Sequence, residues 1–119
     1  MFGFEKLDVW QRAIEFADVV YSSTRAFPAD ERFGLTNQMR RAAVSISSNI
    51  AEGSSRNSRK DFARFLEIAA GSLYEVVSQC HIGLNQGFLT KDEFEILYKS
   101  AEEQSRMLSG LRRSLMNEA

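Results

Sequence analysis

Long stretches without helix-breaking residues are the feature that most constrains this chain. It has one proline, Pro28, and seven glycines among 119 residues. Because proline and glycine are the main breakers of regular structure, the segments between them favour helices. The length fits one domain, which we expect to span residues 1–119.

Hydrophobic periodicity predicts four helices, at about residues 8–26, 35–52, 59–86 and 91–116. In the first, we expect Asp8 to act as the N-cap and Pro28 to end the helix. Its inward face recurs at spacings of three and four, through Trp10, Ile14, Ala17, Tyr21 and Thr24, with Ala13 and Val20 beside them.

The second predicted helix, residues 35–52, carries an apolar stripe beside a polar one. The apolar stripe consists of Leu35, Met39, Ala42, Ala43, Ile46 and Ile50, and the polar stripe of Gln38, Arg41, Ser45, Asn49 and Glu52. Gly53 follows where a left-handed C-cap is commonly found, so we expect it to end the helix.

Capping signals mark the last two helices. Ser58 with Asp61 and Thr90 with Glu93 form capping-box patterns, and Gly87 is expected to end the third helix. The third core face is Phe62, Phe65, Leu66, Ala69, Leu73, Val76, Cys80 and Leu84; the fourth is Phe94, Leu97, Ala101, Gln104, Leu108, Leu111 and Leu115. Four amphipathic helices with short connections predict an all-α, antiparallel, up-down-up-down four-helix bundle.

Two of the helices carry a second, smaller apolar face. Ile68, Glu75 and Ile82 recur every seven residues, with Gly71 between them, and the second helix offers Val44, Ser47 and Ala51. A lone bundle needs one apolar stripe per helix. We therefore expect a subunit interface at Val44, Ala51, Ile68, Gly71, Glu75 and Ile82; scattered surface hydrophobic residues are the alternative.

Basic residues are concentrated in one segment although the whole chain has a net charge of −1. Residues 37–64 have a net charge of +4, with Glu52 and Asp61 opposing Arg40, Arg41, Arg56, Arg59, Lys60 and Arg64. If the second and third helices pack as a hairpin, these bases gather at one end of the bundle. Such a cluster, near Ser and Asn side chains, can contact phosphates. The alternative is a solvated surface with internal ion pairs, such as Arg41 or Arg56 to Glu52.

No catalytic, metal or cofactor pattern accompanies the basic segment. His81 is the only histidine, so a di-iron site with paired Glu-x-x-His motifs is excluded, and a packing role is expected. Cys80 lies in a core stripe and is predicted to be an inert buried thiol. We therefore expect a protein that is not an enzyme and uses no cofactor or metal.

Composition places the chain in a reducing compartment. One cysteine forms no internal disulfide, and no Cys/His zinc spacing occurs. The first residues lack a signal-peptide pattern, and no stretch of about twenty apolar residues indicates a membrane span. We expect a cytoplasmic location without membrane contact.

Several segments together resemble a known family. They are Phe4–Gln11, Phe27–Pro28, Glu31, Phe33–Leu35, Gln38–Ile46, Ser48–Gly53, Arg56 and Ile68–Glu75. They look like the bacterial four-helix-bundle proteins encoded in intervening sequences of 23S ribosomal RNA genes, also labelled S23 ribosomal proteins. After Glu75 this chain continues Val76–Val77, where the family usually has Thr or a second Glu.

The resemblance implies a four-helix bundle that assembles as a homopentamer. It also implies distant kinship with the accessory variability protein of diversity-generating retroelements, a basic pentamer that partners a reverse transcriptase and nucleic acid. The function of the family itself is not established. Two hypotheses follow: an oligomer that binds structured RNA or DNA through the basic segment, and a protein-interaction scaffold or accessory subunit.

Overall fold

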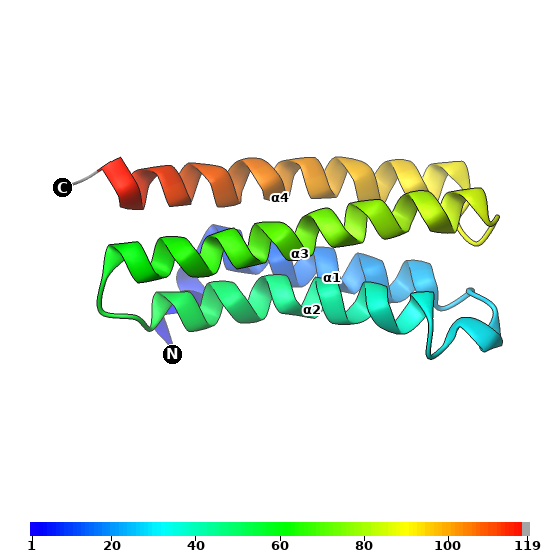
Figure 1. Ribbon diagram of the computed structural model, residues 1–119, viewed down its shortest axis with the longest axis horizontal. Coiled ribbons are helices and arrows are strands. Elements are labelled where there is room, and N and C mark those ends of the chain that lie inside the picture. The colour runs from blue at the N-terminus through cyan, green and yellow to red at the C-terminus, as the bar shows by residue number, and fades with distance from the viewer. Residues whose placement is uncertain (118–119) are drawn as a thin grey trace.

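The structure, a computed structural model that describes residues 1–117, contains four long helices and no strand in that part of the chain (Figure 1). Two short 3-10 helices precede α1 and α2. The elements are η1 (Gly3–Lys6), α1 (Asp8–Thr24), η2 (Ala29–Glu31), α2 (Leu35–Ser54), α3 (Arg59–Asn85) and α4 (Lys91–Asn117). All four predicted helices are present; each starts at the expected residue and ends within two residues of the expected one.

Local capping explains where most helices start and stop. Thr90 and Glu93 form the expected capping box, with Thr90 N–H donating to Glu93 Oε1 at 2.8 Å and Glu93 N–H to Thr90 Oγ1 at 3.1 Å. Ser58 Oγ accepts from Asp61 N–H at 3.0 Å. Gly87 has φ +78°, and Phe88 N–H donates to Gly83 O at 2.8 Å, as in a Schellman motif.

The cap of α1 differs from the prediction. The cap position is Leu7, which contributes no side-chain hydrogen bond, and Asp8 is the first helical residue. Asp8 still lies where a negative charge favours the helix dipole.

The bundle is elongated, with principal extents of 48 × 22 × 20 Å. Contacts are most extensive between α2 and α3, then between α3 and α4. Figure 1 shows the α2–α3 connection and the C-terminal part of α4 at one end, which we call the α2–α3 end. The α1–α2 and α3–α4 connections lie at the other, the α1–α2 end.

The predicted inward faces of α2, α3 and α4 are confirmed, and that of α1 is confirmed for five of its seven residues. Each predicted residue of those three helices is buried or half-buried. In α1 the buried apolar residues are Val9, Ala13, Phe16 and Val20, whereas Ile14 and Tyr21 are exposed. Both sets have the same three-and-four spacing, so periodicity alone does not distinguish them; the packing partners of α1 do.

Gly53 does not form a left-handed cap, which corrects the prediction for α2. The helix continues to Ser54, and in residues 1–117 only Gly87 has a positive φ. A Cβ on Gly53 would lie 2.6 Å from Cβ of Phe65 and 3.0 Å from Cδ1 of Phe62. Gly53 therefore permits the close approach of α2 to the first turns of α3.

Candidate nucleic-acid interface

The predicted basic cluster is divided between two places. Arg56, Arg59, Lys60 and Arg64 lie on the α2–α3 connection and the first turns of α3. Arg40 and Arg41 lie in the second turn of α2, and the helix ends at Ser54. At about 1.5 Å of rise per residue, roughly 20 Å of helix separates the two groups. The expectation of one cluster at one end is therefore wrong, because a helix holds these residues far apart.

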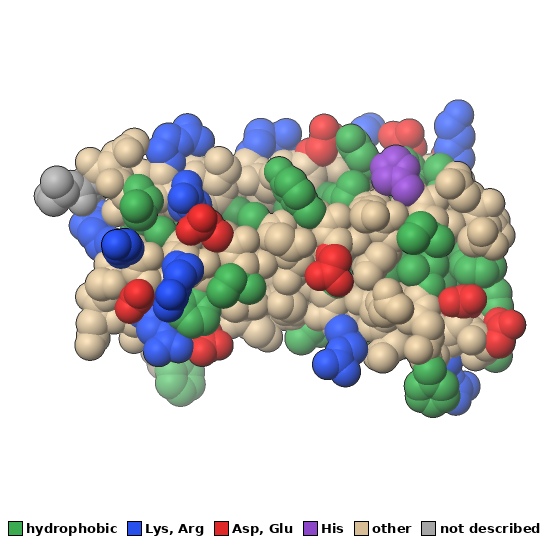
Figure 2. Space-filling model, in the orientation of Figure 1, with side chains coloured by type: hydrophobic (Ala, Val, Ile, Leu, Met, Phe, Trp, Pro, Cys, Tyr) green, Lys and Arg blue, Asp and Glu red, His purple; other side chains and the backbone are tan. Residues whose placement is uncertain are grey.

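The α2–α3 end gains two arginines from elsewhere in the chain. Arg112 and Arg113 lie near the end of α4, and Arg112 Nη2 is 3.4 Å from Oε1 of Glu67 in α3. Figure 2 shows Lys and Arg side chains gathered toward this end, with acidic side chains between them. We call the following six exposed residues the basic end: Arg56, Arg59, Lys60, Arg64, Arg112 and Arg113.

The basic end keeps a positive balance. Segments 52–67 and 110–117 together hold those six bases against three acids, Glu52, Asp61 and Glu67. Sequence reasoning missed the contribution of α4 because it counted charge along one continuous segment. The contribution of α4 can be found by adding the charges at each end of the predicted helices, on the expectation that neighbouring helices run in opposite directions.

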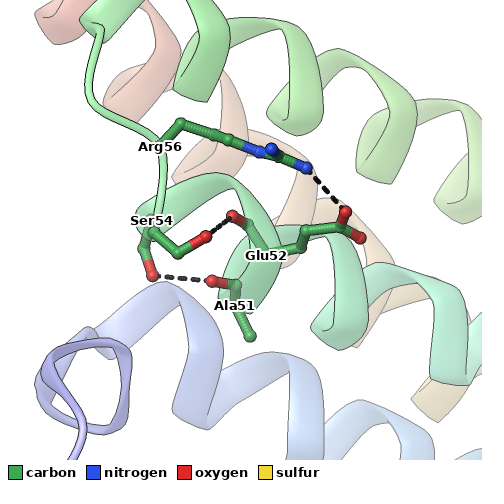
Figure 3. Close-up of polar contacts among 5 residues, drawn as sticks. Ala51, Glu52, Ser54 and Arg56 are labelled. Atoms are coloured by element: carbon green, nitrogen blue, oxygen red, sulfur yellow. Dashed lines mark hydrogen bonds and ion pairs between the residues drawn. The ribbon is translucent and has the colours of Figure 1, made fainter.

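Arg56 makes two contacts within the chain. Its Nη2 lies 2.8 Å from Oε2 of Glu52 (Figure 3). Its Cζ lies 4.7 Å from the centroid of the Phe65 ring. This is one of the internal pairs expected from the sequence. Since both side chains are about half exposed, the pair contributes little to stability and leaves part of the guanidinium open to a ligand.

The last residue of α2, Ser54, and the next residue, Ser55, cap the end of the helix. Ser54 Oγ donates to Ala51 O at 2.7 Å, and Ser55 Oγ donates to Glu52 O at 2.6 Å (Figure 3). These hydroxyls satisfy carbonyl groups at the helix end, the task expected of Gly53. Their hydrogens are therefore used within the chain and are not available to an anion at this end.

Arg40 is held against α1 instead of facing open solvent. Its Nε donates to Thr24 Oγ1 at 2.9 Å, its Nη2 donates to Tyr21 O at 3.4 Å, and its Cζ lies 4.7 Å from the centroid of the Tyr21 ring. Arg41 is exposed and lines a shallow hollow with Tyr21, Asn37 and Val44. Arg40 therefore also helps to join α1 to α2.

The residues predicted to form a subunit interface lie on the outer face of α2 and α3. Val44, Ile68 and Ile82 are 42%, 48% and 49% exposed, which is high for branched aliphatic side chains. Gly71 and Glu75 are exposed and Ala51 is half-buried. A Cβ on Gly71 would meet nothing within 4 Å, so the close approach it permits is not used within the subunit. Ser47, in contrast, is buried.

An apolar groove between α3 and α4 was not predicted. It encloses about 340 Å³, and its lining includes Tyr74, Val77, Tyr98, Ala101 and Glu102. Tyr74 is 68% exposed and Tyr98 39%. Two tyrosines near facing edges of neighbouring helices are the sequence signal that could have identified it.

His81 and Cys80 show no arrangement for catalysis. The His81 ring packs against Phe94 and Tyr98, with centroid distances of 4.9 and 6.4 Å. Cys80 is buried, as predicted, and burial raises the pKa of its thiol to about 12. Within residues 1–117, no group of three or more His, Cys, Asp or Glu side chains could hold a metal ion. None of the helices in that range is long and apolar enough to span a bilayer.

Comparison with known proteins identifies the family. Residues 5–110 match the family described as 23S rRNA-intervening sequence protein. The chain belongs to this family. A crystal structure of a family relative, a protein of unknown function from the S23 ribosomal protein family of Bacteroides thetaiotaomicron VPI-5482, has a TM-score of 0.81 and 23% identity. The match covers 88% of this chain and 95% of that chain, and at this identity it establishes the shared fold. No curated protein sequence matches the chain.

Proposed function

We propose that this protein is a non-enzymatic, oligomeric helical-bundle protein that binds structured RNA or DNA through the basic end. The observation that carries the proposal is the convergence of six exposed Lys and Arg side chains from two chain segments, 52–67 and 110–117. They form the basic end of a subunit whose total charge is −1. Positive charge gathered on one end attracts phosphates by counterion release, even when the whole chain is nearly neutral.

The chemistry of the basic end favours a folded nucleic acid over an extended single strand. Arg and Lys side chains contact phosphates regardless of base identity. Reading of single strands also needs aromatic rings on which bases stack, and here the Phe65 ring lies beneath Arg56. The surface therefore suits the regular phosphate spacing of a duplex or hairpin.

We further propose that the subunit is an antiparallel, up-down-up-down bundle and that it assembles as a homopentamer through the α2–α3 face. Exposed Val44, Ile68 and Ile82 support burial of this face, and the family resemblance supports the pentamer. A closed ring would repeat the basic end around its axis and bring several copies onto one nucleic acid, which raises avidity.

The binding proposal is tested by fluorescence anisotropy of nuclease-treated protein with an RNA hairpin and a DNA duplex over a salt series. The double variant Lys60→Glu/Arg64→Glu should bind at least about tenfold more weakly, and its salt slope should fall by about 0.9 for each phosphate that the variant no longer neutralises. Neither side chain forms an ion pair with a described residue, so the fold should remain intact.

A matched control separates local from general charge effects. Lys91→Glu/Lys99→Glu makes the same change in net charge on exposed positions of α4 away from the basic end. It should bind nearly as the parent protein does. Equal affinity of the parent and the Lys60→Glu/Arg64→Glu variant, at low salt, would remove the proposal.

The assembly proposal is tested by sedimentation velocity. Ile68→Lys/Ile82→Lys should shift the protein toward monomer, whereas Ile96→Lys, on an exposed residue of α4, should not. A parent protein that sediments as a monomer at all concentrations would contradict the proposed ring.

One observation favours a second candidate, a protein-interaction scaffold. The groove between α3 and α4 is mainly apolar and has exposed tyrosines at its lining, which are common anchors at protein interfaces. A protein partner that is retained after nuclease treatment, and lost in Tyr74→Ser, would support this function. A partner retained equally by Tyr74→Ser would exclude the groove as the binding surface.

A further inference from the structure

A second concentration of arginine lies at the α1–α2 end, opposite the basic end. The connection between α1 and α2 encloses a hollow of about 290 Å³. Three arginines and two threonines line it, together with the apolar segment Phe27–Ala29; they are Arg25, Arg32, Arg40, Thr24 and Thr36. We call this hollow the arginine pocket.

One of the three guanidinium groups is held in place. Arg40 Nε donates to Thr24 Oγ1 at 2.9 Å, and that hydroxyl in turn donates to Val20 O at 2.8 Å. Thr24 is 2% exposed, so the anchor is rigid. Nη1 of Arg40 remains without a hydrogen bond to a described residue, and its positive charge has no carboxylate partner there. An ordered, half-buried cation of this kind is prepared for an anion.

The other two arginines add charge that is not held in an ion pair. Arg25 and Arg32 are exposed, and neither forms an ion pair with any residue in the range 1–117. The acids of the same connection, Asp30 and Glu31, are not among the lining residues. Glu31 Oε1 instead accepts from Leu35 N–H at 3.0 Å, at the start of α2.

Thr36 adds a hydroxyl group to the lining of the arginine pocket. The residue is 8% exposed, and its hydroxyl forms no hydrogen bond with the described residues. The hydroxyl is therefore available to donate to a polar ligand in the hollow.

We propose that the arginine pocket binds the terminal phosphate of a small phosphorylated molecule. Guanidinium groups match phosphate oxygens through paired N–H donors, and three cations complement a dianion better than the single charge of a phosphodiester. The volume is near the lower limit of ligand pockets, about 300–1,000 Å³, which suits a phosphate group with a small attached part. This site is distinct from the nucleic-acid contact proposed for the basic end.

The test uses inorganic phosphate as the probe. Thermal unfolding of the full chain, followed by circular dichroism, is compared in phosphate and in chloride at equal ionic strength, above the second pKa of phosphate. Tm should rise with phosphate and saturate, because only the folded chain has the pocket. Arg25→Gln/Arg32→Gln should raise the apparent Kd for phosphate at least about tenfold, because the loss of one charge-assisted hydrogen bond lowers affinity by at least that factor.

Controls define what would overturn the proposal. Lys91→Gln/Lys99→Gln makes the same charge change outside the pocket and should keep the full phosphate response. Absence of a phosphate-specific rise in the parent, or equal responses of the pocket variant and this control, would overturn the site. Both substituted arginines are exposed, so the variants should fold, and their Tm in chloride checks this directly.

Two further arms identify the source of the phosphate and separate this proposal from the first. A 5′-phosphorylated dinucleotide should reproduce the rise in Tm, and the unphosphorylated dinucleotide should not. An equal effect of both would mean that the pocket binds a phosphodiester, contrary to the proposal. Lys60→Glu/Arg64→Glu should lose nucleic-acid binding yet keep the phosphate response, so each proposal can fail alone.

Discussion

The two ends of α2 use arginine in different ways. Near the start of α2, Arg40 is half-buried, hydrogen-bonded to a buried threonine and placed over the Tyr21 ring. Past its end, Arg56 is exposed; it pairs with the exposed Glu52 of α2 and lies over the Phe65 ring. The first side chain lines a hollow, and the second lies on the exposed surface of the basic end.

This difference shows that the fold decides what a basic residue can do. A guanidinium that is fixed by neutral partners keeps its full charge and a defined direction, which favours a small anion. Exposed bases on a convex end act mainly through their summed field, which favours a polyanion and is weakened by salt. The four predictions below test how far the two ends differ, beginning with the largest expected effect.

Gly53→Ala should destabilise the α2–α3 end by about 1–3 kcal/mol, because the new methyl group overlaps Cβ of Phe65. Gly110→Ala, where a Cβ meets nothing within 4 Å, should instead be neutral or stabilise by up to about 1 kcal/mol through helix propensity. Urea unfolding of both variants measures the difference. Equal stabilities would show that the close helix approach at Gly53 is not required.

Arg40→Met should lower the stability of the α1–α2 end by about 1 kcal/mol, because it removes the hydrogen bond to Thr24 and the packing on Tyr21. Thr24 keeps its bond to Val20 O, which limits the loss. Arg41→Met, at the exposed neighbouring position, should change stability by no more than about 0.5 kcal/mol. If the two variants unfold at the same urea concentration, Arg40 has no structural role.

Asn49→Leu tests the hydrogen-bonded polar residues that lie between the two ends of α2, which we call the polar seam: Ser45, Asn49 and Ser72. Asn49 Nδ2 donates to Ser45 O and Ser45 Oγ at 2.8 and 3.0 Å, and Ser72 Oγ of α3 donates to Ser45 Oγ at 2.9 Å. Asn49 is half-buried, so we expect a loss of about 0.5–1 kcal/mol in urea unfolding. A stabilised variant would mean that the seam is better filled by an apolar side chain.

Glu52→Ala should have the smallest effect on stability, below about 0.5 kcal/mol, because its pair with Arg56 is exposed. It should nevertheless tighten nucleic-acid binding at the basic end, since it removes a negative charge and releases the guanidinium. Anisotropy at low salt checks the increase, and urea unfolding checks the stability. Weaker binding would show that Glu52 orients Arg56 toward the nucleic acid.

Much of the fold could be predicted because its signals are local. The Thr90–Glu93 capping box and the Gly87 stop depend on residues within a few positions of each other. The inward faces of α2, α3 and α4 are each marked by one dominant apolar stripe. In α1 two stripes of equal spacing compete, and Phe16 is buried while Tyr21 is exposed because of what packs against α1.

The candidate sites could be predicted only in part. Four residues of the basic end lie close together in the sequence, on the α2–α3 connection and the first turns of α3: Arg56, Arg59, Lys60 and Arg64. Their proximity therefore follows from the sequence. Two other features depend on how the helices lie beside one another. Arg112 of α4 lies near this group, and Arg40 is held away from it, against α1.

The sequence by itself determined which segments are helical, where they start and which family the chain belongs to, because these depend on short-range spacing and on motifs within continuous segments. The tertiary structure decided the role of Gly53, the buried face of α1, and the division of the arginines into a convex basic end and a concave pocket. These features depend on distances between residues that lie far apart in the chain. Packing sets those distances, and no local pattern encodes them.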